Sequence, residues 1–242
     1  MRKWFTIFII VLTVVGLVAV YDLKSYEPTD MAIKALESSE NITVMNGKEW
    51  IEFSTDKVEG IVIYYPGGLV KPESYAIFGT ELASLGYSVY IVKMPLNLAV
   101  LGKDNGLPIL EASDVPVFVG GHSLGGVMAS RFASENNARV AGVFFLASYP
   151  DEKGSLATLN IPSISITGTN DGVMNQEAYE KNSVYFSSNH NEYSIEGGNH
   201  AQFGSYGFQK GDNEATISEQ EQMEETVAVL DRWMKEILNY SE

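Results

Sequence analysis

The chain has 242 residues, of which 45% are apolar, with a formal net charge of −15 and no cysteine. This length suits one domain of α/β size with a short additional segment. The acidic balance argues against a nucleic-acid partner, because the chain has no basic stripe that could neutralise phosphates. The absence of cysteine excludes disulfides, thiolate nucleophiles and cysteine-ligated zinc. No two of the three histidines are spaced like a metal-binding pair, so we expect no metal and no cofactor.

A long apolar run opens the chain. Arg2 and Lys3 precede Trp4–Val20, which contains no charged residue. At about 1.5 Å per helical residue, this run is just long enough to cross the hydrocarbon core of a bilayer. The basic residues on its N-terminal side predict that this end stays in the cytoplasm and that the rest of the chain lies outside. We therefore predict a membrane anchor over residues 1–21, with a cleaved signal segment and secretion as the alternative.

The remainder of the chain alternates between apolar runs and helical patterns. Residues 22–46 are polar with some helical spacing and are expected to form a stalk or peripheral segment, so that the folded domain spans residues 47–242. Strands are predicted over residues 48–53, 60–65, 87–92, 115–119, 140–147, 161–167 and 192–195, and helices over 73–85, 127–135, 176–186 and 217–238. This alternation predicts a mostly parallel sheet with helices on both faces. In such sheets, reactive groups gather at the carboxyl ends of the strands.

One predicted strand runs directly into a glycine-flanked serine. The sequence Gly121-His122-Ser123-Leu124-Gly125 follows this strand and precedes a helix-forming stretch, a context that predicts a nucleophile elbow. A chance Gly-x-Ser-x-Gly pattern is expected in roughly one of six such chains, and a phosphate-binding loop is the alternative. The chain has no glycine-rich nucleotide-binding spacing, so the context favours Ser123 as a nucleophile. The N–H of Leu124 lies at the helix start, where the dipole favours developing negative charge.

A serine nucleophile needs a base, and the base needs an acid that orients it. In enzymes with a nucleophile elbow these groups follow in the order serine, acid, histidine. Asp171 lies in a glycine-flanked loop after the strand predicted over 161–167, and His200 follows the strand predicted over 192–195. We therefore predict Asp171 as the acid and His200 as the base.

Other aspartates and histidines are alternatives for these roles. An aspartate beside glycine is often only a turn residue, and Asp151, which also follows a predicted strand, is the second candidate for the acid. His122 lies within the elbow and is expected to be packed rather than catalytic. His190 precedes its predicted strand and is poorly placed for the base.

The loop after the strand predicted over 60–65 is expected to supply a second oxyanion donor. Pro66-Gly67-Gly68-Leu69 occupies this place. Small residues let such a backbone approach a substrate oxygen closely. Gly68 is the predicted donor, and Leu69 is the alternative.

Five segments that carry these residues form a recurring pattern. They are Tyr64-Tyr65-Pro66-Gly67-Gly68, Gly120-Gly121-His122-Ser123-Leu124-Gly125-Gly126, Ala147-Ser148-Tyr149-Pro150, Gly168-Thr169-Asn170-Asp171 and Gly197-Gly198-Asn199-His200-Ala201-Gln202-Phe203-Gly204. Over roughly residues 48–238, the chain resembles the α/β-hydrolase superfamily, and within it bacterial dienelactone-hydrolase-like and carboxylesterase-like proteins. The resemblance implies an α/β fold with about eight mainly parallel strands, and the same roles for Ser123, Asp171 and His200. Dienelactone hydrolases proper use a cysteine nucleophile, which this chain lacks, so that activity is not carried over.

Together these features predict a serine hydrolase that cleaves carboxylic esters through an acyl-enzyme on Ser123. The connection between the strands predicted over 140–147 and 161–167 can hold at most one small helix. We therefore expect minimal or no lid and a preference for short acyl groups, in a small-molecule, glycan or lipid ester. The alternatives are a cell-surface acyltransferase or a lipase with the same triad, and an inactive binding scaffold with the same fold.

Overall fold

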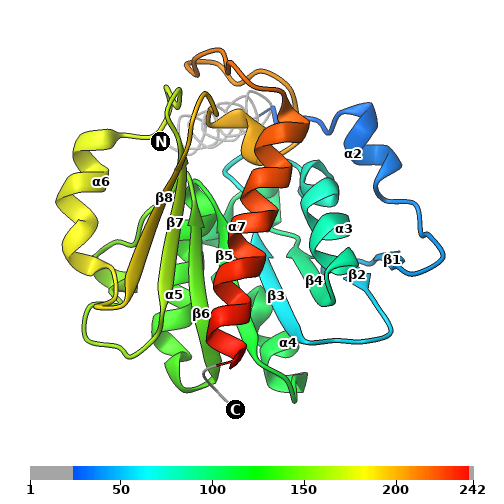
Figure 1. The fold of residues 1–242 in the computed structure, drawn as a ribbon, viewed down its shortest axis with the longest axis horizontal. Helices are drawn as coiled ribbons and strands as arrows, with labels where there is room; N and C mark the ends of the chain where they lie inside the picture. The colour runs from blue at the N-terminus through cyan, green and yellow to red at the C-terminus, as the bar shows by residue number, and fades with distance from the viewer. Residues whose placement is uncertain (1–23, 240–242) are drawn as a thin grey trace, which may run out of the picture.

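The computed structural model describes residues 24–239 as a sheet covered by helices on both faces (Figure 1). The predicted membrane anchor over residues 1–21 lies outside the described residues. Among the helices between residues 24 and 239, none is both long and apolar enough to cross a bilayer.

The described part of the chain contains one eight-stranded sheet in the order β1-β2-β4-β3-β5-β6-β7-β8. The strands are β1 (Thr43–Asn46), β2 (Trp50–Ser54), β3 (Gly60–Tyr65), β4 (Tyr87–Val92), β5 (Val117–His122), β6 (Val140–Leu146), β7 (Ser163–Gly168) and β8 (His190–Ile195). β2 pairs antiparallel with both β1 and β4, whereas all other neighbours are parallel. The carboxyl ends of β3 to β8 therefore meet at one edge, as the alternating sequence pattern predicts.

Helices connect the parallel strands and cover the sheet. The α-helices are α2 (Asp30–Lys34), α3 (Ala76–Ser84), α4 (Leu107–Ala112), α5 (Leu124–Glu135), α6 (Gln176–Asn182) and α7 (Glu219–Asn239). Short 3-10 turns are η1 (Pro72–Tyr75), η2 (Pro95–Asn97), η3 (Ala99–Leu101), η4 (Lys103–Gly106), η5 (Asn137–Arg139), η6 (Glu152–Gly154), η7 (Ser183–Tyr185) and η8 (Ala201–Phe203). In Figure 1, α3 and α7 lie in front of the sheet and α5 lies behind it.

The central strands separate two hydrophobic cores. In β3, Val62 and Tyr64 belong to the core beneath α3 and α7, whereas Ile63 and Tyr65 belong to the core beneath α4 and α5. β6 alternates in the same way, with Phe144 on the first side. Because successive side chains of a strand point to opposite faces, strands that are apolar throughout bury both faces. This burial fixes the central strands and hence the edge at which their loops emerge.

The segment expected to be a stalk is partly built into the domain. It does contain a short helix, α2, but Thr43–Asn46 forms the edge strand β1 and pairs with β2. Ala32 is fully buried, and Tyr26 forms a parallel bridge to Val70. The sequence did not predict β1 because its side chains are mostly exposed and show no apolar alternation. The residues from Thr43 onward therefore belong to the sheet, not to a stalk.

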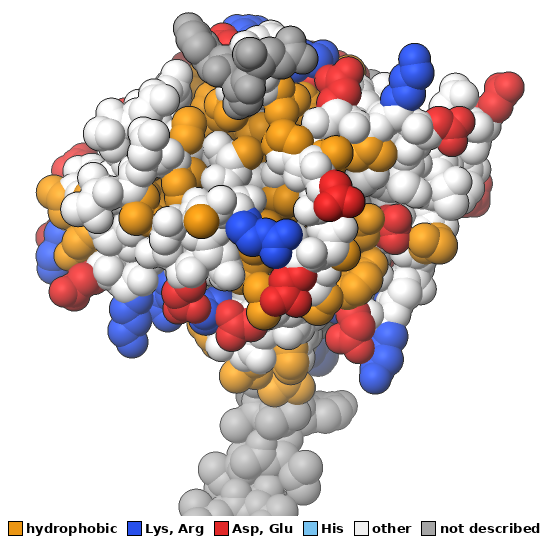
Figure 2. Space-filling model, turned by 90° about the horizontal axis from the view of Figure 1, so that it is seen from below, with side chains coloured by type: hydrophobic (Ala, Val, Ile, Leu, Met, Phe, Trp, Pro, Cys, Tyr) orange, Lys and Arg blue, Asp and Glu red, His pale blue; other side chains and the backbone are white. Residues whose placement is uncertain are grey.

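The surface carries charges of both signs. On the face shown in Figure 2, acidic and basic side chains are interspersed among apolar ones, and no continuous basic stripe crosses it. The excess of acidic residues in the chain is thus not gathered into one patch on this face.

Candidate active site

Ser123 lies in a tight turn between β5 and α5. Its φ of 51° and ψ of −123° are an uncommon conformation for a residue with a side chain. The N–H of Ser123 donates to the carbonyl oxygen of Leu146 on the neighbouring strand at 2.9 Å. A Cβ atom at either Gly121 or Gly125 would overlap the carbonyl oxygen of Tyr65. The two glycines of the motif are therefore required by close backbone contact with the end of β3.

His200 and Asp171 form a buried pair. His200 Nδ1 and Asp171 Oδ2 are 2.8 Å apart, and the two side chains are 1% and 3% exposed. The other carboxylate oxygen of Asp171 accepts the N–H groups of Val173 and Met174 at 2.8 and 2.7 Å. His200 Nε2 is buried and has no hydrogen-bond partner. A carboxylate at Nδ1 keeps the proton on that nitrogen, which leaves the Nε2 lone pair available as a base.

Ser123 and His200 line the same cavity. It has a volume of about 270 Å³, and its wall also contains Leu124, Val127, Ala147, Ser148, Tyr149, Val173, Met174 and Asn175. The loops that contribute these residues follow β5, β6, β7 and β8, at the upper edge of the sheet in Figure 1. The structure thus brings the predicted nucleophile, base and acid together at one edge, as the strand order requires.

The second candidate for the acid, Asp151, is engaged elsewhere. Its carboxylate pairs with the Arg131 guanidinium, whose Nε lies 3.1 Å from each oxygen, and accepts the N–H of Gly154 at 3.0 Å. Burial alone would raise the pKa of Asp151, but the hydrogen bonds from Arg131 and Gly154 outweigh it and lower the pKa. Asp151 therefore caps η6 and anchors it to α5 instead of contacting His200.

His122 is packed beside the candidate base. Its ring centroid lies 4.5 Å from that of His200, and its Nδ1 is 2.9 Å from the Tyr75 hydroxyl, which accepts the N–H of Gly67. Burial, together with the neighbouring His200, lowers the pKa of His122 well below its usual value. His122 therefore contributes to packing, as the sequence predicts.

His190 lies far from this edge of the sheet. It is the first residue of β8, two residues before the strand start expected from sequence. Its ring stacks on Phe186 with centroids 3.7 Å apart. Because β8 runs parallel to its neighbour β7, its first residue lies at the amino-end edge, opposite the cavity.

The two candidates for the second oxyanion donor differ in whether their N–H groups are already hydrogen-bonded. The N–H of Leu69 donates to the carbonyl oxygen of Asn97 at 2.7 Å and is therefore occupied. The N–H of Gly68 makes no hydrogen bond to any described residue. Gly68 also lies against Leu124, since a Cβ on it would be 3.2 Å from Leu124 Cδ2. Gly68 thus lies beside the Leu124 side chain, and its N–H, unpaired among the described residues, makes it the stronger candidate for the second donor.

A buried aspartate that the sequence analysis missed joins the acid and base loops. Asp212 is 8% exposed and accepts the N–H of Ala201 at 2.8 Å and the N–H of Gly172 at 3.0 Å. These donors immediately follow His200 and Asp171. One carboxylate therefore links the loop that contains Asp171 to the loop that contains His200.

A buried glutamine supports the histidine loop from α7. Gln222 is fully buried, accepts the N–H of Asn199 at 2.9 Å and donates to the carbonyl oxygen of Asn199 at 2.8 Å. In sequence, Asp212 resembles an ordinary turn residue and Gln222 an ordinary helix residue. No local signal could have identified either one, because their partners lie far away along the chain.

The model of the alpha/beta hydrolase family matches residues 61–224, which is more than half of the chain. The chain belongs to the alpha/beta hydrolase family. This membership and the eight-stranded sheet confirm the predicted superfamily and fold class. No curated protein gives a significant match.

Several solved structures share the fold of this hydrolase. Dienelactone hydrolase from Anabaena variabilis is 16% identical, with a TM-score of 0.58 over 83% of this chain and 97% of that one. A soluble variant of monoglyceride lipase from Saccharomyces cerevisiae is 11% identical, with a TM-score of 0.58 over 84% and 97%. An esterase from Mycobacterium tuberculosis is 13% identical, with a TM-score of 0.55 over 83% and 95%. At these identities the likeness concerns the fold alone.

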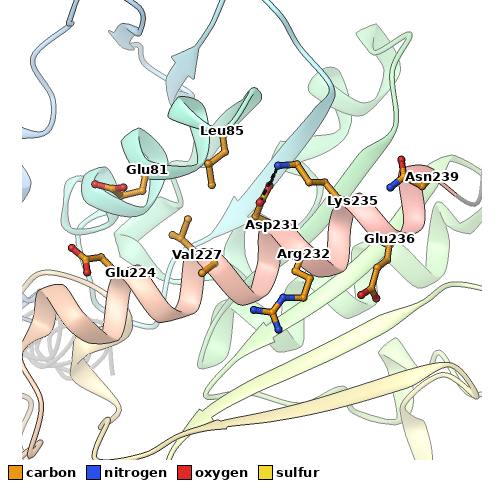
Figure 3. A pocket seen from close by; sticks show the side chains of 10 residues that line it. Glu81, Leu85, Glu224, Val227, Asp231, Arg232, Lys235, Glu236 and Asn239 are labelled. Atoms are coloured by element: carbon orange, nitrogen blue, oxygen red, sulfur yellow. Dashed lines mark hydrogen bonds and ion pairs between the residues drawn. The ribbon is translucent and has the colours of Figure 1, made fainter.

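The predicted catalytic residues do not line every hollow that the described residues form. One of about 650 Å³ lies between α3 and α7 and contains the ion pair of Asp231 with Lys235 (Figure 3). Its other charged side chains are Glu81, Glu224, Arg232 and Glu236, and none of the predicted catalytic residues lines it. Among residues 24–239, no cluster of three or more histidine, aspartate or glutamate side chains could hold a metal ion.

Proposed function

We propose that this hydrolase cleaves carboxylic esters through an acyl-enzyme on Ser123. The observation that carries the proposal is the buried His200–Asp171 pair at 2.8 Å, which leaves Nε2 of His200 unpartnered beside the cavity that Ser123 lines. A serine on a strained strand-to-helix turn with such a pair is the arrangement that acyl transfer requires. Solved structures with the same fold include an esterase and a monoglyceride lipase, which also favours an ester substrate.

Each group has a defined role in the proposed reaction. The Ser123 hydroxyl oxygen forms a bond to the acyl carbon while His200 Nε2 takes the hydroxyl proton. The carbonyl oxygen becomes an oxyanion that accepts the N–H groups of Leu124 and Gly68. When the tetrahedral intermediate collapses, the ester C–O bond breaks and His200 gives its proton to the departing alcohol oxygen. Water then attacks the acyl carbon while His200 Nε2 takes its proton. The bond from the acyl carbon to Ser123 Oγ breaks, His200 returns the proton to Oγ, and the carboxylic acid leaves. Asp171 stabilises the imidazolium in both steps.

The walls of the cavity favour short acyl groups. The one regular element that the structure describes in the connection between β6 and β7 is the three-residue turn η6, so this connection forms no helical lid. A long acyl chain needs an apolar tunnel to bind in. Each methylene group that stays in water lacks about 0.8 kcal/mol of favourable burial free energy. A cavity of about 270 Å³ is small for a long chain.

We further propose that the domain acts outside the cytoplasm, held to the membrane by residues 1–21. The support is the uncharged run Trp4–Val20 behind Arg2 and Lys3. Protease treatment of intact cells should cut the domain under conditions that also cut a known surface protein. Protection of the domain under those conditions would contradict this location.

A panel of p-nitrophenyl esters of graded acyl length, run on wild type and Ser123→Ala, tests the reaction. Wild type should prefer acetate and butyrate esters, and a fluorophosphonate probe should label Ser123 alone. Ser123→Ala should lose about 10⁴-fold or more in kcat. Full turnover by Ser123→Ala would remove the acyl-enzyme proposal. A kcat/KM that rises steadily up to palmitate would instead identify a lipase.

A further inference from the structure

The turn that follows β4 exposes apolar side chains in an uncommon backbone conformation. Leu96, Val100 and Leu101 are 55%, 49% and 53% exposed. Leu96 and Asn97 have φ values of 56° and 53°, in the left-handed region that residues with side chains rarely adopt. This turn is fixed in its conformation and exposes three large apolar side chains to water. Such a surface is typical of a site that binds a protein or a membrane.

Hydrogen bonds tie this turn to the first described residues of the chain. Asn97 Nδ2 donates to Ser25 Oγ at 2.8 Å, and the carbonyl oxygen of Asn97 accepts the N–H of Leu69 at 2.7 Å. The carbonyl oxygen of Leu69 in turn accepts the N–H of Tyr26 at 2.7 Å. The exposed turn, the loop that contains Gly68 and residues 25–26 therefore form one connected unit.

The length of the intervening chain limits how far this unit can lie from the proposed anchor. The apolar run ends at Val20, five residues before Ser25. A fully extended chain covers at most about 3.6 Å per residue, so Ser25 lies within about 18 Å of the end of the run. The headgroup layer beside the hydrocarbon core is itself about 5–8 Å thick. An inserted anchor therefore keeps the turn close to the bilayer surface.

We propose that Leu96, Val100 and Leu101 contact the surface of the bilayer that holds the anchor, with their side chains among the lipid headgroups. This inference rests on the membrane anchoring proposed above. The lysines on either side of the turn are already engaged, Lys93 with Asn46 Oδ1 and Lys103 with two carboxylates. The contact is therefore apolar and should depend little on salt, unlike attraction of free lysines to anionic lipids.

The contact has a consequence for the substrate. The turn holds Leu69, the neighbour of Gly68, and both lie at the carboxyl-end edge of the sheet, where the cavity with Ser123 is located. Lipid contact at the turn brings this edge to the membrane surface. The substrate class that fits is an ester presented at that surface, with a short acyl group within reach of Ser123.

Because the chain contains no cysteine, a single introduced cysteine can be labelled at a chosen position. Leu101→Cys in the full chain is labelled with an environment-sensitive fluorophore and reconstituted into vesicles of phosphatidylethanolamine and phosphatidylglycerol that contain a doxyl-labelled lipid. Val184→Cys is the matched control, because Val184 is 67% exposed and lies in η7, before β8 and hence at the opposite edge of the sheet. Both variants should hydrolyse a water-soluble ester like wild type.

The label at position 101 should emit at shorter wavelength and be quenched at least twofold more than the label at position 184, at both low and high salt. Equal quenching of the two labels, in protein that floats with the vesicles, would overturn the contact while leaving the anchor intact. Protein that fails to float would overturn the anchor and the contact together.

A second pair of variants separates this inference from the proposed reaction. Leu101→Ser and Val184→Ser are compared on a soluble acetate ester and on a short-chain ester carried in vesicles. Leu101→Ser should lose severalfold activity only on the vesicle-borne ester, and Val184→Ser on neither. Equal activity of both variants on the vesicle-borne ester would count against the contact. If wild type hydrolysed neither ester, the proposed reaction itself would be wrong.

Discussion

The serine turn and the acid–base loops reach the same cavity by different physical means. At the turn, Gly121 and Gly125 leave no room for a Cβ beside the end of β3, so a five-residue motif determines the backbone path of Ser123. Asp171 and His200 follow separate strands and are held by side chains further along the chain, such as Asp212. Nucleophile geometry is thus largely local, whereas acid–base geometry depends on the C-terminal part of the fold.

The largest expected effect comes from breaking the acid–base pair. Asp171→Asn should keep the fold but lower kcat by about 10⁴-fold, because the amide no longer fixes the Nδ1-protonated tautomer of His200. Asp151→Asn is the matched control and should stay near wild type, since Asp151 pairs with Arg131. Initial rates with p-nitrophenyl acetate measure both. An inactive Asp151→Asn beside a fully active Asp171→Asn would mean that the acid is misassigned.

The local character of the serine turn can be tested through stability. Gly125→Ala should destabilise the protein by about 3 kcal/mol, because the new Cβ overlaps backbone carbonyl oxygens that cannot move far. Gly207→Ala is the control, since Gly207 has positive φ but nothing within 4 Å of an added Cβ. It should cost only about 1 kcal/mol. Urea denaturation measures both, and equal costs would show that close contact at the turn is unimportant.

The long-range character of the acid–base loops can be tested at Asp212. Asp212→Ala leaves the N–H groups of Gly172 and Ala201 without their acceptor, which should cost about 1–3 kcal/mol of stability. It should also lower kcat by about 10- to 100-fold with little change in KM, because both loops lose their common support. Asp212→Asn should be intermediate, and Asp56→Ala, at an exposed aspartate, should resemble wild type. Unchanged kcat in Asp212→Ala would argue for a purely structural role.

The smallest effect concerns His190 and the pH dependence of stability. Burial lowers the pKa of His190 to about 4, although the Glu192 carboxylate partly opposes it. In the unfolded chain a histidine takes up a proton near pH 6.5. Between these values the unfolded state binds more protons, so stability falls as the pH drops from about 6.5 to about 4.

The contribution of His190 should be about 1–2 kcal/mol, less than the full 1.4 kcal/mol per pKa unit because the ring is partly solvated. His190→Gln should flatten the fall over this pH range. Urea denaturation of both proteins at pH 7, 5.5 and 4.5 measures the difference. If the free energy of unfolding fell equally with pH in both proteins, the His190 ring would not contribute to the pH dependence of stability.

The sequence predicted the elements that have strong local signals. The central strands are largely apolar runs, and β3 and β4 have the predicted limits. The placement of Ser123, Asp171 and His200 at strand ends followed from strand order alone. β1 was missed because an exposed edge strand of four residues has no apolar period, and its pairing with β2 is what makes it a strand. Earlier residues of the expected stalk or peripheral segment contact the domain through buried Ala32 and the bridge from Tyr26 to Val70.

The sequence by itself determined the fold class, the serine turn and the order of the candidate catalytic residues. Hydrophobic periodicity, glycine spacing and the order of strands along the chain can all be read directly from the sequence. Only the tertiary structure gave grounds to prefer Asp171 to Asp151, and Gly68 to Leu69. Each choice depends on a partner distant in the chain: His200 for Asp171, Arg131 for Asp151 and Asn97 for Leu69. Hydrogen bonds over such separations exist only after the sheet has brought its loops together, so no local pattern can contain them.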